Sequence, residues 1–106
     1  MIFVRIKENS WLARWAAKKM KCNSVALVVG RTIYLHNRSP SQFLQDKQWV
    51  LHELKHVEQY QKNGWIRFLW LYGLETLKNG YANNRFEVEA RESVHDETLL
   101  AKYRFE

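Results

Sequence analysis

The alternation of apolar and polar residues begins with three short runs that are rich in β-branched and aromatic side chains. They lie at 2–6, 24–29 and 32–36, and only Gly30 and Arg31 separate the last two. Such runs are typical of strands, and a two-residue connection that contains glycine is typical of a hairpin turn. The sequence therefore predicts one early strand and, over the second and third runs, an antiparallel hairpin.

Four longer stretches instead repeat their apolar residues at the spacing of an α-helix. They span about 10–20, 42–62, 65–78 and 85–100, and Asn-Gly pairs end the second and third. A chain of 106 residues is long enough for one domain, 1–106, with one modest core. The order of elements predicts an α+β fold, in which a small antiparallel sheet of three short strands packs with about four helices.

Two of these helices carry further expectations. Asn9 or Ser10 is expected to cap the first helix. One face of that helix is expected to gather its apolar residues, which are Trp11, Leu12, Trp15, Ala16 and Met20. The helix 65–78 is apolar around more than one face, so we interpret it as a partly exposed core helix between its two neighbours. An exposed aromatic stripe on it would alternatively bind a partner, a membrane surface or an apolar substrate side chain.

The second helical stretch contains the motif H-E-x-x-H at residues 52–56. Residues four apart lie on one face of a helix, so the imidazoles of His52 and His56 can reach the same zinc ion. Glu53 is then placed to act as general base towards a zinc-activated water. The alternative is that two surface histidines share an amphipathic helix by chance.

A catalytic zinc needs a third protein ligand and one open position. The other histidines, His36 and His95, are possible sources, but the acidic start of the last helix is the more attractive one. Within it, Glu87 is the preferred ligand and Glu89 the second choice. In an alternative interpretation Asn84 and Glu87 form a helix cap, with the glutamate reaching back to the helix start instead of to a metal.

The motif and the downstream glutamate resemble the gluzincin metallopeptidases, and more narrowly the minigluzincins. These are minimal soluble relatives of the catalytic domain of membrane-integrated CAAX-type prenyl proteases. There, the ligand Glu is followed three residues on by a small residue and four on by Asp. Glu87 and Ala90 match this pattern, whereas Arg91 stands in place of the Asp. Since that Asp orients the first histidine, Glu89, Glu58 or a backbone carbonyl is expected to replace it.

The resemblance extends over about residues 24–91 and implies a zinc metalloendopeptidase of zincin-like architecture, with a peptide or protein as substrate. An extended substrate is expected to add to an edge of the hairpin sheet. The segment 95–106 is a candidate regulatory tail that would fold back into the cleft and keep the enzyme latent, as in a zymogen. His95, Tyr81 and Tyr103 are weaker candidates for stabilising an oxyanion.

The charge distribution suggests alternatives to a peptidase. The net charge is +6, and residues 1–47 hold nine Lys and Arg against two acids. A basic half of this kind can attract nucleic acid or anionic lipid. No recognition-helix or RNA-binding signature accompanies it, so nucleic acid is not an expected partner, whereas peripheral membrane contact is compatible with the pattern. The alternatives are therefore a latent or non-catalytic zinc-binding protein and a basic module that binds polyanions or membrane surfaces.

The remaining composition bears on location. A single cysteine, Cys22, excludes an internal disulfide bond and fits a reducing compartment. The most apolar run, 65–74, is much shorter than the roughly 20 residues of a membrane span. The N-terminus carries charges within its apolar run and no small-residue cleavage site, unlike a signal peptide. We therefore expect a soluble cytoplasmic protein.

Overall fold

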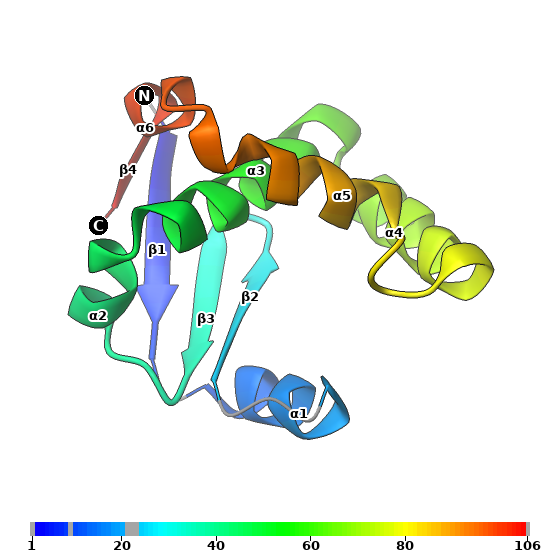
Figure 1. The fold of residues 1–106 in the computed structure, drawn as a ribbon, viewed down its shortest axis with the longest axis horizontal. Helices are drawn as coiled ribbons and strands as arrows, with labels where there is room; N and C mark the ends of the chain where they lie inside the picture. Colours follow the sequence, from blue (N-terminus) through cyan, green and yellow to red (C-terminus); the bar gives the residue numbers. More distant parts are fainter. Residues whose placement is uncertain (1, 9, 21–23, 106) are drawn as a thin grey trace.

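The computed structural model describes residues 2–8, 10–20 and 24–105. In chain order its elements are β1 (Ile2–Lys7), α1 (Trp11–Met20), β2 (Val25–Val29), β3 (Thr32–His36), α2 (Pro40–Gln45), α3 (Lys47–Asn63), α4 (Trp65–Asn79), α5 (Arg85–Glu92), a 3₁₀ turn η1 (Ser93–His95), α6 (Thr98–Lys102) and β4 (Tyr103–Phe105) (Figure 1). The candidate cap Asn9 and the single cysteine Cys22 lie outside the described residues.

The four strands form one mixed sheet in the order β2-β3-β1-β4. The predicted hairpin is confirmed, since β2 and β3 pair antiparallel with Val25 opposite His36, and Gly30 takes a positive φ of 65° in the turn. The α+β class is confirmed, but a three-stranded antiparallel sheet is wrong because β1 runs parallel to both β3 and β4. The hairpin docks on β1 through its second strand, and the three-residue β4 is too short to show a period in the sequence.

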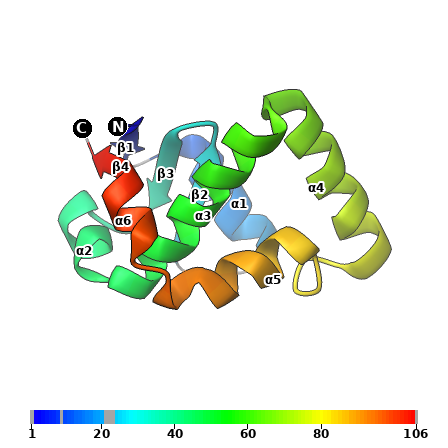
Figure 2. The same ribbon diagram turned by 90° about the horizontal axis from the view of Figure 1, so that it is seen from above.

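Helix α3 lies across one face of this sheet and forms the centre of the core (Figures 1 and 2). Its buried apolar residues are Val50, Leu51, Leu54 and Val57. They belong to one cluster with Val4 on β1 and with Ile33 and Leu35 on β3. This helical spacing is the one that the sequence predicts, and it turns the histidine side of α3 away from the sheet.

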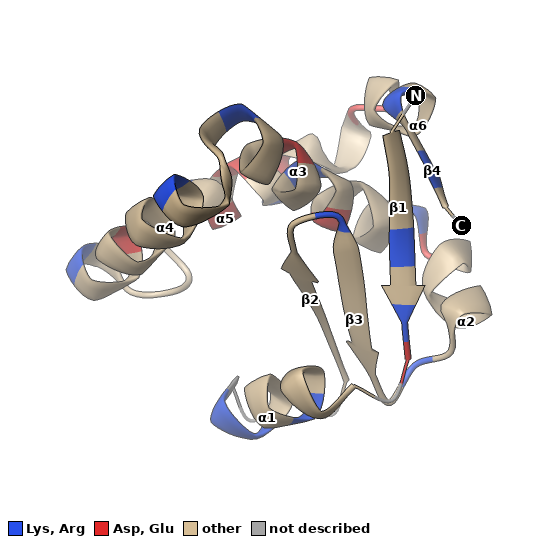
Figure 3. Ribbon diagram, turned by 180° about the vertical axis from the view of Figure 1, so that it is seen from behind, with Lys and Arg blue, Asp and Glu red and all other residues tan. Residues whose placement is uncertain are grey.

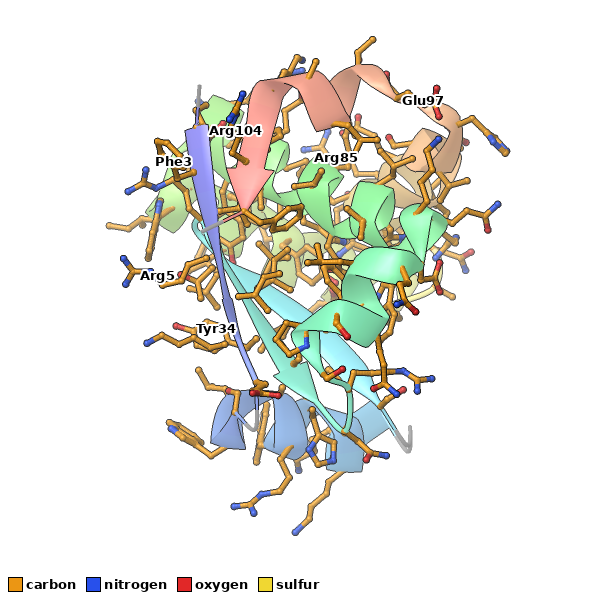
Figure 4. All side chains as sticks on the ribbon, turned by 90° about the vertical axis from the view of Figure 1, so that its left-hand side faces the viewer. Phe3, Arg5, Tyr34, Arg85, Glu97 and Arg104 are labelled. Atoms are coloured by element: carbon orange, nitrogen blue, oxygen red, sulfur yellow. The ribbon has the colours of Figure 1, made fainter. Side chains whose placement is uncertain are left out.

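The other face of the sheet is covered mainly at one end, by α1. Phe3 and Arg5 of β1 project from the uncovered part (Figure 4). The Ser10 hydroxyl accepts from the backbone N–H of Ala13 (3.4 Å) and so starts α1. The expected apolar face of α1 is wrong in part, because its packed residues are the small ones, Ala13, Ala16 and Ala17, whereas Trp11 and Trp15 are exposed. Three alanines allow α1 to approach the sheet closely.

The expected motif helix, 42–62, is two helices in the structure. The Ser39 hydroxyl and the Gln42 side chain form a reciprocal capping box that starts α2. Asp46 ends α2, and its carboxylate accepts from the backbone N–H of Trp49 (3.1 Å) to start α3. The break has a local cause, because an aspartate of this kind satisfies free N–H groups at a helix start better than it continues a helix.

The expected last helix, 85–100, is also divided. The Ser93 hydroxyl donates to the carbonyl of Glu89 (2.8 Å), a back-bond that bends helices. Asp96 then accepts from the backbone N–H of Thr98 (3.2 Å) at the start of α6. The single helix predicted here is therefore wrong, and two short helices stand in its place.

Residues 99–105 belong to the body of the fold. Leu99 and Tyr103 are buried in the main core. β4 extends the sheet beside β1, with Ile2 opposite Tyr103, and Phe3 opposite Arg104 (Figure 4). None of the described helices combines the length and the apolar composition that crossing a membrane requires.

Candidate metal centre

Two helices place the predicted ligands on facing surfaces. α3 carries His52 and His56, and α5 carries Glu87. The start of α5 is fixed by Asn84, which is fully buried and accepts from the backbone N–H of Phe86 (2.9 Å). Asn84 therefore caps the helix, as one interpretation of the sequence held. Glu87 takes no part in that cap, because its carboxylate turns towards α3.

The structure brings the three predicted ligands together. His52 Nε2 lies 3.1 Å from Glu87 Oε1, and His56 Nε2 lies 3.2 Å from Glu87 Oε2. Potential ligand atoms of the three residues all lie within 4.8 Å of one another, and they form a group able to hold a metal ion in the described part of the chain. Ligands about 2.0–2.1 Å from a tetrahedral zinc are roughly 3.3 Å apart, so both distances between nitrogen and oxygen are close to those of an assembled site.

The charges at the site favour an ionised carboxylate. Burial opposes ionisation of Glu87, but hydrogen bonds with His52 and His56 outweigh it and hold its pKa well below the usual range. Burial also opposes protonation of His56, yet the bond to Glu87 and the charges of Glu53 and Glu87 raise its pKa to about 9. A metal cation would replace that proton between the same two groups.

Glu53 lies beside this group and is also buried. Burial raises its pKa to about 7, against the opposing effects of His56 and His52. A carboxyl group with a pKa near neutrality can both accept and deliver a proton at physiological pH. Glu53 thus follows the candidate ligand His52 in the sequence and is a buried carboxyl group with a raised pKa.

Gln59 is a residue of the candidate site that the sequence did not indicate. Its side-chain oxygen is 2.8 Å from His56 Nδ1, and its amide nitrogen donates to the Phe86 carbonyl (3.0 Å) and to Glu89 (2.9 Å). Those two acceptors fix which end of the amide faces the histidine. His56 must therefore donate from Nδ1, which leaves Nε2 free for a metal. Its position three residues after His56, on the same side of the helix, could have indicated a contact between the two side chains.

Tyr72 is a second residue that the sequence reasoning missed, because it was grouped with the apolar side chains of its helix. Its hydroxyl donates to Glu87 Oε2 (2.5 Å). Burial, together with this bond, raises the pKa of Tyr72 far above the usual range, so it stays a donor. The candidate ligand Glu87 is thus held from α4 as well as from α3.

The predicted substitutes for the family Asp take other positions. Glu89 accepts from Gln59 and so acts one step away from His56. Glu58 instead pairs with lysines, namely Lys55 (2.6 Å), Lys62 (3.6 Å) and Lys102 (2.8 Å). The Arg91 guanidinium donates to the carbonyl of Ala82. The orienting contact described here is therefore made by Gln59 and acts on the second histidine of the motif, not on the first.

A cavity of about 310 Å³ adjoins the site. Glu53, His56 and Glu87 line it on one side, and all of β2, an outer strand of the sheet, lines it on another. Ala16 of α1 and Leu69 of α4 are also in its lining. The site thus faces a space that an extended chain beside β2 can enter.

The candidates for oxyanion stabilisation separate into two groups. Tyr81 lines the cavity, and burial and Glu87 raise its pKa well above the usual range. Tyr103 instead donates to Gln61 (3.0 Å), away from this lining. His95 lies in η1, and no residue from 93 to 105 is in the cavity lining. Within the described part of the expected regulatory tail, Tyr103–Phe105 form the edge strand β4.

Comparisons with protein-family models, with curated proteins and with solved structures gave no match to this chain. The chemistry of the site itself, a buried His-His-Glu group beside a buried glutamate, is therefore the basis for a functional interpretation.

Proposed function

We propose that this chain is a zinc-dependent metalloendopeptidase. The observation that carries the proposal is the position of Glu53, a buried carboxyl group beside His52, His56 and Glu87 in the wall of a cavity. The resemblance of the H-E-x-x-H motif, of Glu87 and of Ala90 to gluzincins supports the same reaction.

The three clustered residues fit a catalytic metal. Two imidazole nitrogens and one carboxylate are a ligand set of catalytic zinc, and three protein ligands leave a fourth position open. His52, His56 and Glu87 would hold the ion. When bound there, zinc supplies a Lewis acid that activates water and polarises a carbonyl group.

The chain's own groups would move the proton. Glu53 would accept it from the attacking water and deliver it to the nitrogen of the departing amine. Burial raises the pKa of this carboxyl group in the metal-free site, which favours its taking up a proton. Tyr72 and Gln59 would hold Glu87 and His56 in place, and Tyr81 is the cavity residue best placed to donate to a developing negative charge.

The substrate would be an extended peptide or protein segment. Among the described residues, β2 has a strand neighbour on its β3 side only, and the residues of β2 line the cavity. A peptide that adds to such an edge forms main-chain hydrogen bonds and needs little sequence specificity. It would run between β2 and the wall that carries Glu53.

The test compares zinc content and peptide hydrolysis in the wild type and in Glu53→Gln. We expect the variant to keep its zinc and to lose hydrolysis of an unstructured protein such as casein by about a factor of a hundred or more. Glu8→Gln, an exposed glutamate in the N-terminal segment, is the matched control and should retain activity. Zinc binding without hydrolysis in the wild type would instead identify a non-catalytic zinc-binding protein.

A further inference from the structure

Helix α4 presents a broad apolar face to solvent. Ile66, Trp70 and Leu77 are 86%, 67% and 85% exposed, and Leu69 and Leu74 beside them are exposed too. These five residues are called here the outer face of α4. Helical geometry places the stripe of Ile66, Trp70 and Leu77 on the side opposite the buried part of the helix. Soluble monomers seldom expose so many large apolar side chains together unless the surface binds something.

The helix is attached to the domain by its inner side alone. Phe68 is its buried residue, and the Phe68 ring packs against Tyr60 of α3 (4.4 Å between centroids) and Phe86 of α5 (5.0 Å). In Figure 2, α4 projects beyond the rest of the fold. The expected partly exposed core helix is therefore confirmed: one side of α4 packs in the core, and the opposite side is exposed.

The charges around the outer face are of one sign. Arg67 and Lys78 are both exposed and lie near the two ends of the stripe. Figure 3 shows the Lys and Arg positions of α4 in blue. The acid on this helix, Glu75, is half-buried and accepts from the Arg85 backbone (3.2 Å) and from Asn79 (3.3 Å). The whole chain carries +6. The surface thus complements a partner that is both apolar and anionic.

The same charges disfavour an antiparallel pairing with a second copy of the chain. When a two-fold axis relates two antiparallel helices, the same patch meets itself. The stripe from Ile66 to Leu77 is centred near Leu71 and Tyr72, so Arg67 of each copy would approach Lys78 of the other. Two such pairs of like charges oppose the association, and no exposed acid on α4 compensates for them.

We propose that the outer face of α4 binds the surface of an anionic lipid bilayer. The helix would lie in the interfacial plane, with Ile66 and Leu77 below the lipid phosphates and Arg67 and Lys78 against them. Trp70 is suited to the boundary between the lipid headgroups and the acyl chains because its ring is amphipathic. The proposed binding would locate the protein at a membrane surface, and it does not depend on the metal centre.

The experiment is co-sedimentation of the full chain with phosphatidylcholine vesicles, with and without phosphatidylserine. We expect binding to the mixed vesicles that weakens as salt is added, and a blue shift of tryptophan fluorescence. The double variant Ile66→Glu with Leu77→Glu should lower the partition coefficient by about a factor of ten or more, since each buried apolar side chain contributes on that order. The same substitutions at Leu44 and Leu100, exposed leucines of α2 and α6, form the control.

Matched charge variants separate a specific surface from general attraction. Arg67→Gln with Lys78→Gln, and Lys7→Gln with Arg104→Gln, each lower the net charge of +6 by two. The first pair should weaken binding by roughly fivefold per charge, and the second pair much less. Equal weakening by both pairs would overturn the proposal, as would binding that survives in the glutamate variant.

Two further outcomes would also overturn it. The first is binding that is lost in Trp11→Glu with Trp15→Glu but kept in the α4 variant, which assigns the membrane contact to α1. The second is a concentration-dependent dimer that the α4 glutamates abolish, measured by sedimentation equilibrium in the absence of lipid. Circular dichroism of each variant verifies that the fold is retained, and zinc content reports separately on the metal centre.

Discussion

Replacing Gln59 with leucine tests whether a hydrogen-bond chain prepares His56 for metal binding. The substitution keeps the approximate volume of the side chain and removes three contacts: the one with His56 Nδ1 (2.8 Å) and the two donated to Phe86 (3.0 Å) and Glu89 (2.9 Å). Gln59 is 2% exposed, so water cannot readily replace it at the buried contacts. Both stability and metal affinity should therefore respond.

The magnitudes follow from which groups are left without a partner. The Phe86 carbonyl is in a buried contact and loses its donor from Gln59, at a cost of about 1–3 kcal/mol. Glu89 is half-exposed and can turn to water, so it adds little. For a domain of this size the melting temperature should fall by roughly 4–8 °C per kcal/mol. The loss of an orienting contact on a metal-bound histidine typically weakens affinity by about 10–100-fold.

The assay is competitive titration of zinc against a chromophoric chelator, combined with urea unfolding of the metal-free protein. Gln48→Leu removes an exposed glutamine from the same helix and should change neither quantity. If Gln59→Leu lowers stability but leaves zinc affinity within a factor of two or so of the wild type, Gln59 only holds α5 to α3, and its role in positioning His56 is refuted.

Three further predictions concern the neighbours of the site. Tyr72→Phe removes the donor to Glu87 but keeps the ring, so zinc titration should show affinity weakened by about tenfold with little change in melting temperature; an unchanged affinity would contradict a role for the hydroxyl. Asn84→Ala removes the cap of α5 and the hydrogen bonds that Asn84 donates to the Tyr72 carbonyl and to Thr76. Urea unfolding should show that the free energy of unfolding falls by about 2–3 kcal/mol, and a fall below about 0.5 kcal/mol would count against this account. Burial raises the pKa of Tyr60 from 10.0 to about 12, so its neutral form stabilises the fold fully below pH 10, and that contribution disappears as the pH rises through about 12. Tyr60→Phe should be less stable at neutral pH because the hydrogen bond to the Val28 carbonyl is lost. Urea unfolding across this pH range should also show that the variant loses less stability at alkaline pH than the wild type.

The local features of the site could be predicted because their physics is local. His52, Glu53 and His56 share one helical turn, and the apolar period of Val50, Leu51, Leu54 and Val57 fixes which side of α3 faces the core. Asn84 as a cap is also a local signal. Glu87 came from resemblance to a family pattern and is placed by the fold, since nothing in the spacing of the sequence measures the distance between two helices.

The features that the sequence did not reveal depend on long-range packing. Which hairpin strand meets β1, and in which direction, depends on contacts across the sheet and not on the period of either strand. Trp11 and Trp15 are exposed because α1 packs against the sheet through its three alanines instead. Tyr72 looked like one more apolar residue because its hydroxyl meets Glu87 only after α4 and α5 are folded together.

The central claim is that His52, His56 and Glu87 form a catalytic zinc site. Its most direct test is metal analysis, with thermal unfolding in the presence and absence of zinc, of protein purified without a histidine tag. His56→Ala is measured beside it. We predict about one zinc ion per chain and a zinc-dependent rise in melting temperature that His56→Ala abolishes. A wild-type protein that binds no zinc and gains no stability from it would contradict the account.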